Sequence, residues 1–220
     1  MYKYKIIILI CLILIIFIFS CFICSAKELP LKNKVIYIDP GHGGNDPGAN
    51  YKDIKESELN LKISLKLAKL LEDNGAIVYM TRYDNYNLAN INSYNIKRSD
   101  LNNRIKLINN SDCDMFLSIH LNAYTSSTWY GAQTFYTNNN ENNKKLAMIL
   151  QDKFKKHLKT NRNIKIINDR YLYNNIYKLG VLLEVGFITN INERNLLIQD
   201  NYQYKIANII LEGIIEYYNK

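Results

Sequence analysis

The chain has 220 residues, a mass of 25.7 kDa and a formal net charge of +8, from 28 basic and 20 acidic residues. This length fits one ordinary domain with at most a short appendage. Three of the four cysteines lie in the first 26 residues, which leaves Cys113 alone in the rest of the chain. A single cysteine forms no internal disulfide, so the composition excludes a disulfide-stapled miniprotein and a cysteine-ligated zinc finger.

The first 26 residues form an apolar leader. Lys3 and Lys5 precede an unbroken apolar run over residues 6–19, and small residues at 24–26 are typical of a cleavage site. The pattern predicts either a signal peptide cleaved after Ala26 or an uncleaved N-terminal membrane anchor. Because the positive charges precede the apolar run, residues 27–220 are expected to be exported across the cytoplasmic membrane.

Residues 27–220 alternate between short β-rich runs and amphipathic helices. The pattern predicts strands at 35–38, 77–81, 115–120, 132–136 and 181–184, and helices at 58–74, 98–110, 146–158 and 202–218. Such alternation predicts a single α/β domain, with a twisted, mostly parallel or mixed central sheet and helices on both faces. The pattern alone gives five strands.

Several kinds of chemistry find no support in the sequence. It contains no Gly-x-Ser-x-Gly motif, and Gly41-His42-Gly43-Gly44 lacks the Lys-Ser/Thr that completes a phosphate-binding loop. The densest basic group, between Lys153 and Arg162, lies on and just after a predicted helix whose other side is apolar. That arrangement is typical of a solvated helix face, so no nucleic-acid partner is predicted.

Two of the three histidines follow predicted strands. His42 lies in the glycine-rich turn after the first strand, and His120 ends the strand at 115–120. Residues beyond the carboxyl ends of strands line the ligand crevice of an α/β sheet, so these two imidazoles are expected to meet. With one carboxylate they would form a three-ligand zinc site that leaves a position open for water. His157, in the lysine-rich helix, is expected on the surface.

The candidate carboxylates are Asp39, Asp46, Glu56, Glu58 and Glu184. Glu56 and Glu58 both fall at the start of a predicted helix, where a carboxylate is also favoured by the helix dipole alone. Glu184 ends an apolar run that should be buried, so it needs a partner or a role, and a general base beside a metal-bound water is one such role. Asp39, between a strand and a glycine turn, is expected to orient His42.

Five stretches, in this order, resemble the zinc-dependent N-acetylmuramoyl-L-alanine amidases of the third amidase type. They are VIYIDPGHGGNDPGA (35–49), ESELNL (56–61), GAIVYMTR (75–82), FLSIHLNA (116–123) and LEVGFITN (183–190). The resemblance runs from about residue 35 to the end of the chain. It implies about six strands, a Zn²⁺ cofactor, and hydrolysis of the amide between N-acetylmuramic acid and L-alanine in peptidoglycan.

The resemblance also implies roles for individual residues. The zinc ligands of the family fall on His42, Glu56 and His120, and its catalytic glutamate falls on Glu184. The family's usual lysine after the first glutamate is replaced by Ser57, which leaves Glu58 as a rival ligand. The matching residues 59–61 favour Glu56.

A narrower likeness concerns residues 120–147 and 160–162, which resemble the spore-cortex, germination-specific branch of the family. It implies cortex peptidoglycan as substrate, in the pathway to muramic lactam, on the wall side of the membrane. No wall-binding repeat is visible in the sequence, so an accessory protein or N-terminal membrane association would supply targeting. Two alternatives are a zinc peptidase that cuts within the stem peptide and a catalytically silent wall-binding protein.

Overall fold

The computed structural model describes residues 2–23, 29–167 and 171–220, so the cleavage site expected after Ala26 lies outside the described residues. The chain divides into two units, Met1–Pro30 and Leu31–Lys220. The first unit contains helix α1 (Tyr2–Ile23). In the part of the chain that the structure describes, no helix has the length and apolar character needed to cross a membrane.

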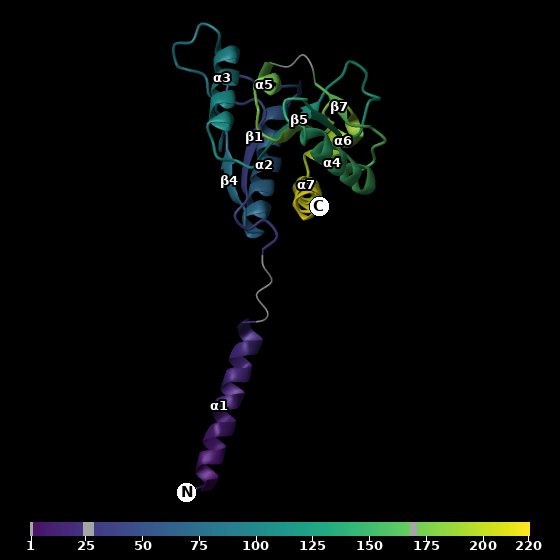
Figure 1. Ribbon diagram of the computed structural model, residues 1–220. Helices are drawn as coiled ribbons and strands as arrows, with labels where there is room; N and C mark the ends of the chain where they lie inside the picture. The colour runs from purple at the N-terminus through teal and green to yellow at the C-terminus, as the bar shows by residue number, and fades with distance from the viewer. Residues whose placement is uncertain (1, 24–28, 168–170) are drawn as a thin grey trace. The chain divides into compact units, whose positions relative to one another are not determined.

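The second unit is an α/β domain built on a six-stranded sheet (Figure 1). Its strands are β1 (Val35–Pro40), β4 (Ile77–Met80), β5 (Met115–Asn122), β6 (Gln133–Tyr136), β7 (Lys165–Ile166) and β8 (Gly180–Phe187), and a separate small hairpin pairs β2 (Asn50–Tyr51) with β3 (Ile54–Lys55). Its helices are α2 (Glu56–Asp73), α3 (Ile96–Asn109), α4 (Asn143–His157), α5 (Tyr171–Asn174), α6 (Ile191–Leu197) and α7 (Asp200–Asn219).

The sheet order is β4-β1-β5-β8-β6-β7, and the sheet is mixed. The first four of these strands run parallel, β6 runs antiparallel to β8, and β7 runs parallel to β6. This confirms the predicted fold class and the strand number that the family resemblance implied. The sequence pattern missed β7, because two residues at a sheet edge carry no readable alternation.

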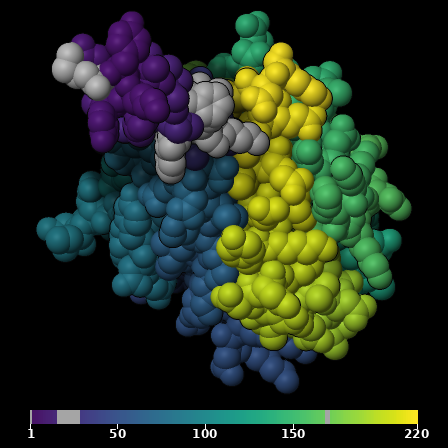
Figure 2. All heavy atoms as spheres, turned by 90° about the horizontal axis from the view of Figure 1, so that it is seen from below, coloured from purple at the N-terminus to yellow at the C-terminus, as the bar shows by residue number. Residues whose placement is uncertain are grey.

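Helices cover both faces of the sheet, as predicted. Alternate residues of the strands pack on α2, α4 and α7 in the larger core, which includes Leu67, Leu150 and Ile210. The intervening residues face α3 and α5 in a smaller core around Tyr37 and Phe116. Figure 2 shows α7 in yellow, between α2 in blue and α4 in green.

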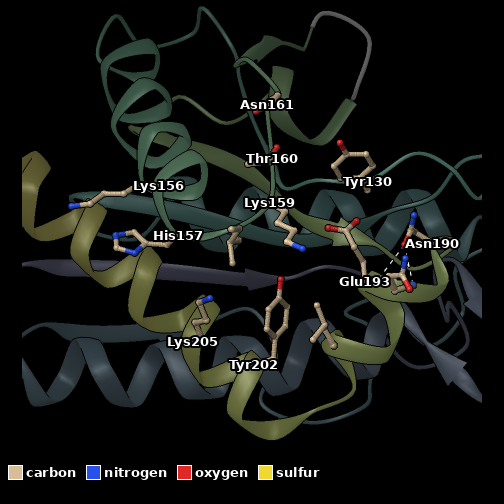
Figure 3. A pocket seen from close by; sticks show the side chains of 13 residues that line it. Tyr130, Lys156, His157, Lys159, Thr160, Asn161, Asn190, Glu193, Tyr202 and Lys205 are labelled. Carbon is tan, nitrogen blue, oxygen red and sulfur yellow. Dashed lines mark hydrogen bonds between the residues drawn. The ribbon is translucent and has the colours of Figure 1, made fainter.

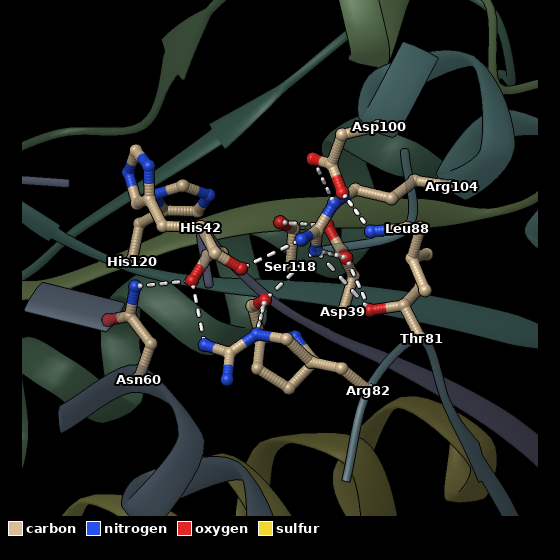
Figure 4. Close-up of polar contacts among 12 residues, drawn as sticks. Asp39, His42, Asn60, Thr81, Arg82, Leu88, Asp100, Arg104, Ser118 and His120 are labelled. Atoms are coloured by element: carbon tan, nitrogen blue, oxygen red, sulfur yellow. Dashed lines mark hydrogen bonds and ion pairs between the residues drawn. The ribbon is translucent and has the colours of Figure 1, made fainter. Parts of the chain in front are cut away.

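A buried ion pair ties α3 to the central strands. Arg104 of α3 donates to the Asp39 carboxylate of β1 at 2.6 Å and to Asp100, one helical turn earlier, at 2.9 Å (Figure 4). Thr81 and Ser118 donate to the same Asp39 carboxylate from the neighbouring strand end and strand, at 2.7 and 2.9 Å. Each buried charge is therefore matched by an opposite charge and by hydrogen bonds, which is the condition for tolerating it in a core.

We expect Arg104→Ala to lower the free energy of unfolding by about 3–5 kcal/mol, because the substitution leaves the buried Asp39 carboxylate without its counter-charge. Lys106→Ala, on an exposed position of the same helix, is the matched control and should change it by less than about 0.5 kcal/mol. Urea unfolding followed by circular dichroism measures both values. Equal effects of the two substitutions would contradict this account of Asp39.

The same ion pair predicts how stability depends on pH. Burial alone would raise the pKa of Asp39, but the Arg104 charge and the hydrogen bond from Thr81 outweigh burial and hold that pKa below its ordinary value of 3.8. A lowered pKa stabilises the fold above the unfolded-state pKa, and this contribution is lost as the pH falls through the lower folded-state pKa.

The stability gap between the wild type and Asp39→Asn should therefore be widest near neutral pH. It should narrow below a pH of about 4, as the wild-type carboxylate takes up a proton. Urea unfolding of both proteins at neutral and acidic pH measures the gap. A gap that stays constant across this range would show that the Asp39 charge does not stabilise the fold.

Candidate functional site

The turn after β1 presents His42 at the carboxyl end of the sheet. Its backbone has a positive φ of 62°, which is uncommon for a residue with a side chain. Two buried arginines hold the carbonyls of this turn: Arg104 donates to the His42 carbonyl at 2.7 Å, and Arg82 donates to the Gly41 carbonyl at 2.9 Å. The strained turn is thus fixed by charged donors from two other elements.

Glu56 is the first residue of α2, and only 3% of its surface is exposed. Its carboxylate accepts hydrogen bonds from the backbone N–H groups of Ala49 at 2.9 Å and Leu121 at 3.1 Å. Asn60, one turn along α2, donates to it at 3.3 Å. The carboxylate is therefore held by the loop before its own helix and by β5, so its position is set by more than the helix terminus.

His42, Glu56 and His120 converge at this point. The Glu56 Oε1 atom lies 3.3 Å from His42 Nε2 and 2.9 Å from His120 Nδ1. The two imidazole rings meet edge to face with 4.9 Å between their centres, and Figure 4 shows them side by side. One donor atom from each of the three residues lies within 4.8 Å of the others, a separation suited to one shared metal ion.

Two glycines allow the three side chains to approach the backbone this closely. A Cβ on Gly41 would lie 2.2 Å from the His120 ring. Gly48 has a φ of +67°, and a Cβ there would lie 2.6 Å from both the Glu56 carboxylate and the His42 ring. Glycine is required at both positions because any side chain would occupy the space of the cluster.

The charges of the cluster are strongly coupled. Burial alone would raise the pKa of Glu56, but hydrogen bonds to His120 and His42 outweigh burial and lower that pKa well below its ordinary range. Burial alone would lower the pKa of His42, but Glu56 and Asp46 together raise it to about 9. The buried carboxylate therefore draws positive charge into the cluster.

The two carboxylates that the residue pattern left open lie in different surroundings. Glu56 lies between the two histidines, whereas Glu58 pairs with Lys55 at 3.2 Å, with 41% of the Glu58 side chain exposed. The expectation that Asp39 orients His42 is wrong. Asp46 contacts His42 Nδ1 at 2.8 Å, because the turn folds back on itself, while the Asp39 carboxylate is taken up by Arg104.

Glu184 lies in β8, in line with this cluster. It is in register with His120 of β5 on one side and with Gln133 of β6 on the other. Paired positions on neighbouring strands place their side chains on the same face of the sheet. Glu184, with 5% of its surface exposed, is therefore the strand neighbour of His120 on the side away from β1.

Sequence reasoning assigned no role to several residues that build the site. Asp46 was one of the candidate carboxylates, and its position four residues after His42 in a glycine-rich turn could have assigned it to that histidine. Arg82 and Arg104 give no such signal, because each lies far from His42 in sequence and acts through a backbone carbonyl. Only the fold brings them together.

A large cleft of about 990 Å³ lies elsewhere, between the end of α4 and the start of α7 (Figure 3). None of the four predicted site residues lines it. His157 does, and it also lies 3.5 Å from Glu212 of α7. The histidine that was expected on the surface is thus half-buried at a helix pair, away from the His42 cluster.

Two imidazole nitrogens and one carboxylate oxygen are a donor set that suits zinc. The Asp46 contact to the other nitrogen of His42 resembles the carboxylate that commonly orients a metal-ligating histidine. With a buried carboxylate beside the cluster, the arrangement suits metal-assisted hydrolysis. We therefore expect the site to hydrolyse an ester or an amide with an activated water molecule.

Comparison with known proteins supplies the family. Residues 36–216 match the family model described as N-acetylmuramoyl-L-alanine amidase. The chain is 41% identical over 197 residues to the germination-specific N-acetylmuramoyl-L-alanine amidase of Bacillus subtilis, covering 88% of this chain and 83% of that one.

Solved structures of amidases have a fold similar to that of this chain. The CwlD amidase of Clostridioides difficile, in complex with the GerS lipoprotein, has a TM-score of 0.81 and 40% identity, covering 84% of this chain and 98% of that one. The catalytic domain of CwlV, from Bacillus (Paenibacillus) polymyxa var. colistinus, has a TM-score of 0.74 and 30% identity, covering 84% and 98%. By its sequence and by its fold, the chain belongs to the N-acetylmuramoyl-L-alanine amidase family.

Proposed function

We propose that the protein hydrolyses the amide between the lactyl group of N-acetylmuramic acid and the L-alanine of the peptidoglycan stem. The observation that carries this proposal is the convergence of His42, Glu56 and His120 in a chain of the amidase family. The family's name, N-acetylmuramoyl-L-alanine amidase, describes a bond found in peptidoglycan, so peptidoglycan is the proposed substrate class. Hydrolysis of an unstrained amide needs both an activated water and a proton donor for the departing amine.

His42, Glu56 and His120 would hold the metal, and the donor set fits zinc because it combines two imidazoles with one carboxylate. A zinc ion bound there supplies a Lewis acid that polarises the amide carbonyl and lowers the pKa of a water molecule. The protein's own contribution is to fix the three donors. Glu56 is held by two backbone N–H groups, and His42 is held by Asp46 and by the arginines that bind its turn.

Glu184 is proposed as the general base and acid. Its carboxylate takes a proton from the attacking water and delivers it to the departing nitrogen of L-alanine, so one group serves both proton transfers. Support comes from its register with His120, which places the buried Glu184 carboxylate on the same face of the sheet as a proposed metal ligand.

We also propose that the natural substrate is spore-cortex peptidoglycan, in the pathway to muramic lactam. The likeness of residues 120–147 to the germination-specific branch supports this assignment, as does the 41% identity to an amidase with that name. Removal of the stem peptide frees the lactyl carboxyl of muramic acid, which is the group that closes the lactam ring. A separate deacetylase must free the amine.

The protein is proposed to act on the wall side of the membrane, with residues 1–26 as signal peptide or anchor and 27–220 as the catalytic domain. The basic and apolar pattern of the leader supports export. An accessory protein partner is part of the proposal as well, because the Clostridioides difficile relative was solved in complex with a lipoprotein.

Incubation of the protein with stem-bearing peptidoglycan should release peptides that begin with alanine, identified by mass spectrometry. Chelation of the metal should abolish their release and added zinc should restore it, because the metal supplies the activated water. Peptide release that continues after chelation would contradict the metal-dependent mechanism. Shortened stems in place of intact ones would identify a peptidase, and no release together with wall binding would identify a silent binding protein.

Three glutamate variants separate the proposed roles. Glu56→Ala should lose both zinc content and activity, because it removes a ligand. Glu184→Ala should keep its zinc and lose about 10²–10⁴-fold in turnover, the usual cost of removing a general base. Glu58→Ala is the matched control, since this partly exposed residue lies on the same helix turn as Glu56, and it should change neither quantity.

Zinc content by elemental analysis and turnover by peptide release measure these effects. Loss of zinc in Glu184→Ala with retention in Glu56→Ala would show that the two roles are reversed. Loss of zinc in Glu58→Ala would show that the wrong carboxylate of the helix has been assigned to the metal.

A further inference from the structure

Three exposed aromatic residues, Tyr124, Trp129 and Tyr130, form what we call the aromatic platform, on the segment between β5 and β6. Their exposed fractions are 57%, 47% and 52%. The Tyr124 and Trp129 rings pack edge to face with 5.4 Å between their centres, so the platform has internal order. Large aromatic surface kept together in water is typical of a binding surface.

Hydrogen-bonding groups border the platform. A hollow of about 310 Å³ beside it is lined by Trp129 and Tyr130 together with Thr128, Asn161 and Arg162. The Arg162 guanidinium lies 5.1 Å from the Trp129 ring centre, and its Nε donates to the Tyr130 carbonyl at 2.7 Å. The hollow therefore presents an aromatic face and several hydrogen-bonding groups to the same ligand.

Tyr130 also lines the large cleft, as does Asn161. Figure 3 shows Tyr130 across that cleft from Tyr202, with Lys159 and Glu193 near it. Polar and charged groups thus lie near Tyr130 in both the hollow and the cleft. Three aromatic rings with polar and charged groups beside them suit a ligand that is itself polar at its edges better than a broad apolar protein surface.

A short chain of contacts links the aromatic platform to the row of paired strand positions that contains His120 and Glu184, which we call the catalytic row. Arg162 donates to the Gln133 side chain at 3.3 Å, and Gln133 is in register with Glu184. Glu184 is in register with His120. His120, Glu184 and Gln133 therefore lie on one face of three neighbouring strands, and Arg162 continues this row to Trp129.

We propose that the aromatic platform binds N-acetylhexosamine units of the glycan strand that neighbour the muramic acid whose stem is removed. The inference rests on the proposed function and adds a sugar subsite to it. A pyranose ring offers a C–H face that stacks on an aromatic ring, and its acetamido and hydroxyl groups match Asn161, Thr128 and Arg162. Because the glycan is a polymer, sugars beside the reacting unit must lie next to the catalytic row.

Trp129 is the single tryptophan of the sequence, so its fluorescence reports on the platform directly. The probe is the tetramer of N-acetylglucosamine, which has no stem peptide, added to the full chain with the metal removed by chelation. We expect a saturable change in Trp129 emission. This readout needs neither zinc nor amide hydrolysis.

Tyr130→Ala keeps the reporter and should weaken tetramer binding about threefold to tenfold, the range expected for one aromatic contact. Tyr177→Ala is the matched control, because Tyr177 is an exposed tyrosine that precedes β8, at the opposite end of that strand from the site. It should leave tetramer binding unchanged. Thermal unfolding of both variants checks that the fold is retained.

In the active enzyme, Trp129→Ala should raise the KM for glycan strands about threefold to tenfold. It should leave the release of peptide from N-acetylmuramoyl-dipeptide unchanged, because that substrate has no neighbouring sugar. The sugar subsite would be overturned if the tetramer caused no saturable fluorescence change, or if the wild type and Tyr130→Ala bound the tetramer equally. Either result would favour a protein partner on the platform instead. Tetramer binding without amide hydrolysis would instead leave the subsite standing and overturn the proposed function.

Discussion

One buried carboxylate sets the requirements for the rest of this site. Glu56 lies against the imidazoles of His42 and His120, and its negative charge is removed from water. A charge in that position is tolerated only when hydrogen bonds and positive charge compensate for its lost hydration. Two backbone N–H groups and two histidines supply that compensation, and a divalent cation would supply more of it.

The surrounding structure holds the backbone of the turn that carries His42 in place. Arg104 joins the Asp39 carboxylate to the His42 carbonyl, and Arg82 binds the Gly41 carbonyl beside it. The Arg104 guanidinium therefore takes part both in the buried ion pair with Asp39 and in holding the backbone of His42. A turn with a positive φ at His42 costs conformational energy, and these charged donors offset it.

The sequence was sufficient for the main elements, and the three residues that it proposed as metal ligands converge in the structure, but it did not predict what supports them. Periodicity located the strands that carry His120 and Glu184, since buried strands give long apolar runs. It could not choose between Glu56 and Glu58, because both fit a helix start, and the family likeness favoured Glu56. The expectation that Asp39 orients His42 was wrong. Asp39 and Asp46 both lie within four residues of His42, and only the fold shows that Asp39 pairs with Arg104 while Asp46 contacts His42. The two-residue strand β7 and the buried arginines depend on contacts between distant segments, which periodicity does not record.

We propose that His42, Glu56 and His120 hold a zinc ion in this amidase. X-ray absorption at the zinc edge of the zinc-loaded full chain tests it most directly, because the spectrum identifies the atoms bound to the metal. We expect two imidazole nitrogens among the light ligand atoms, with the imidazole signal reduced by about half in His42→Ala. A spectrum without imidazole scattering, or one that His42→Ala leaves unchanged, would contradict it.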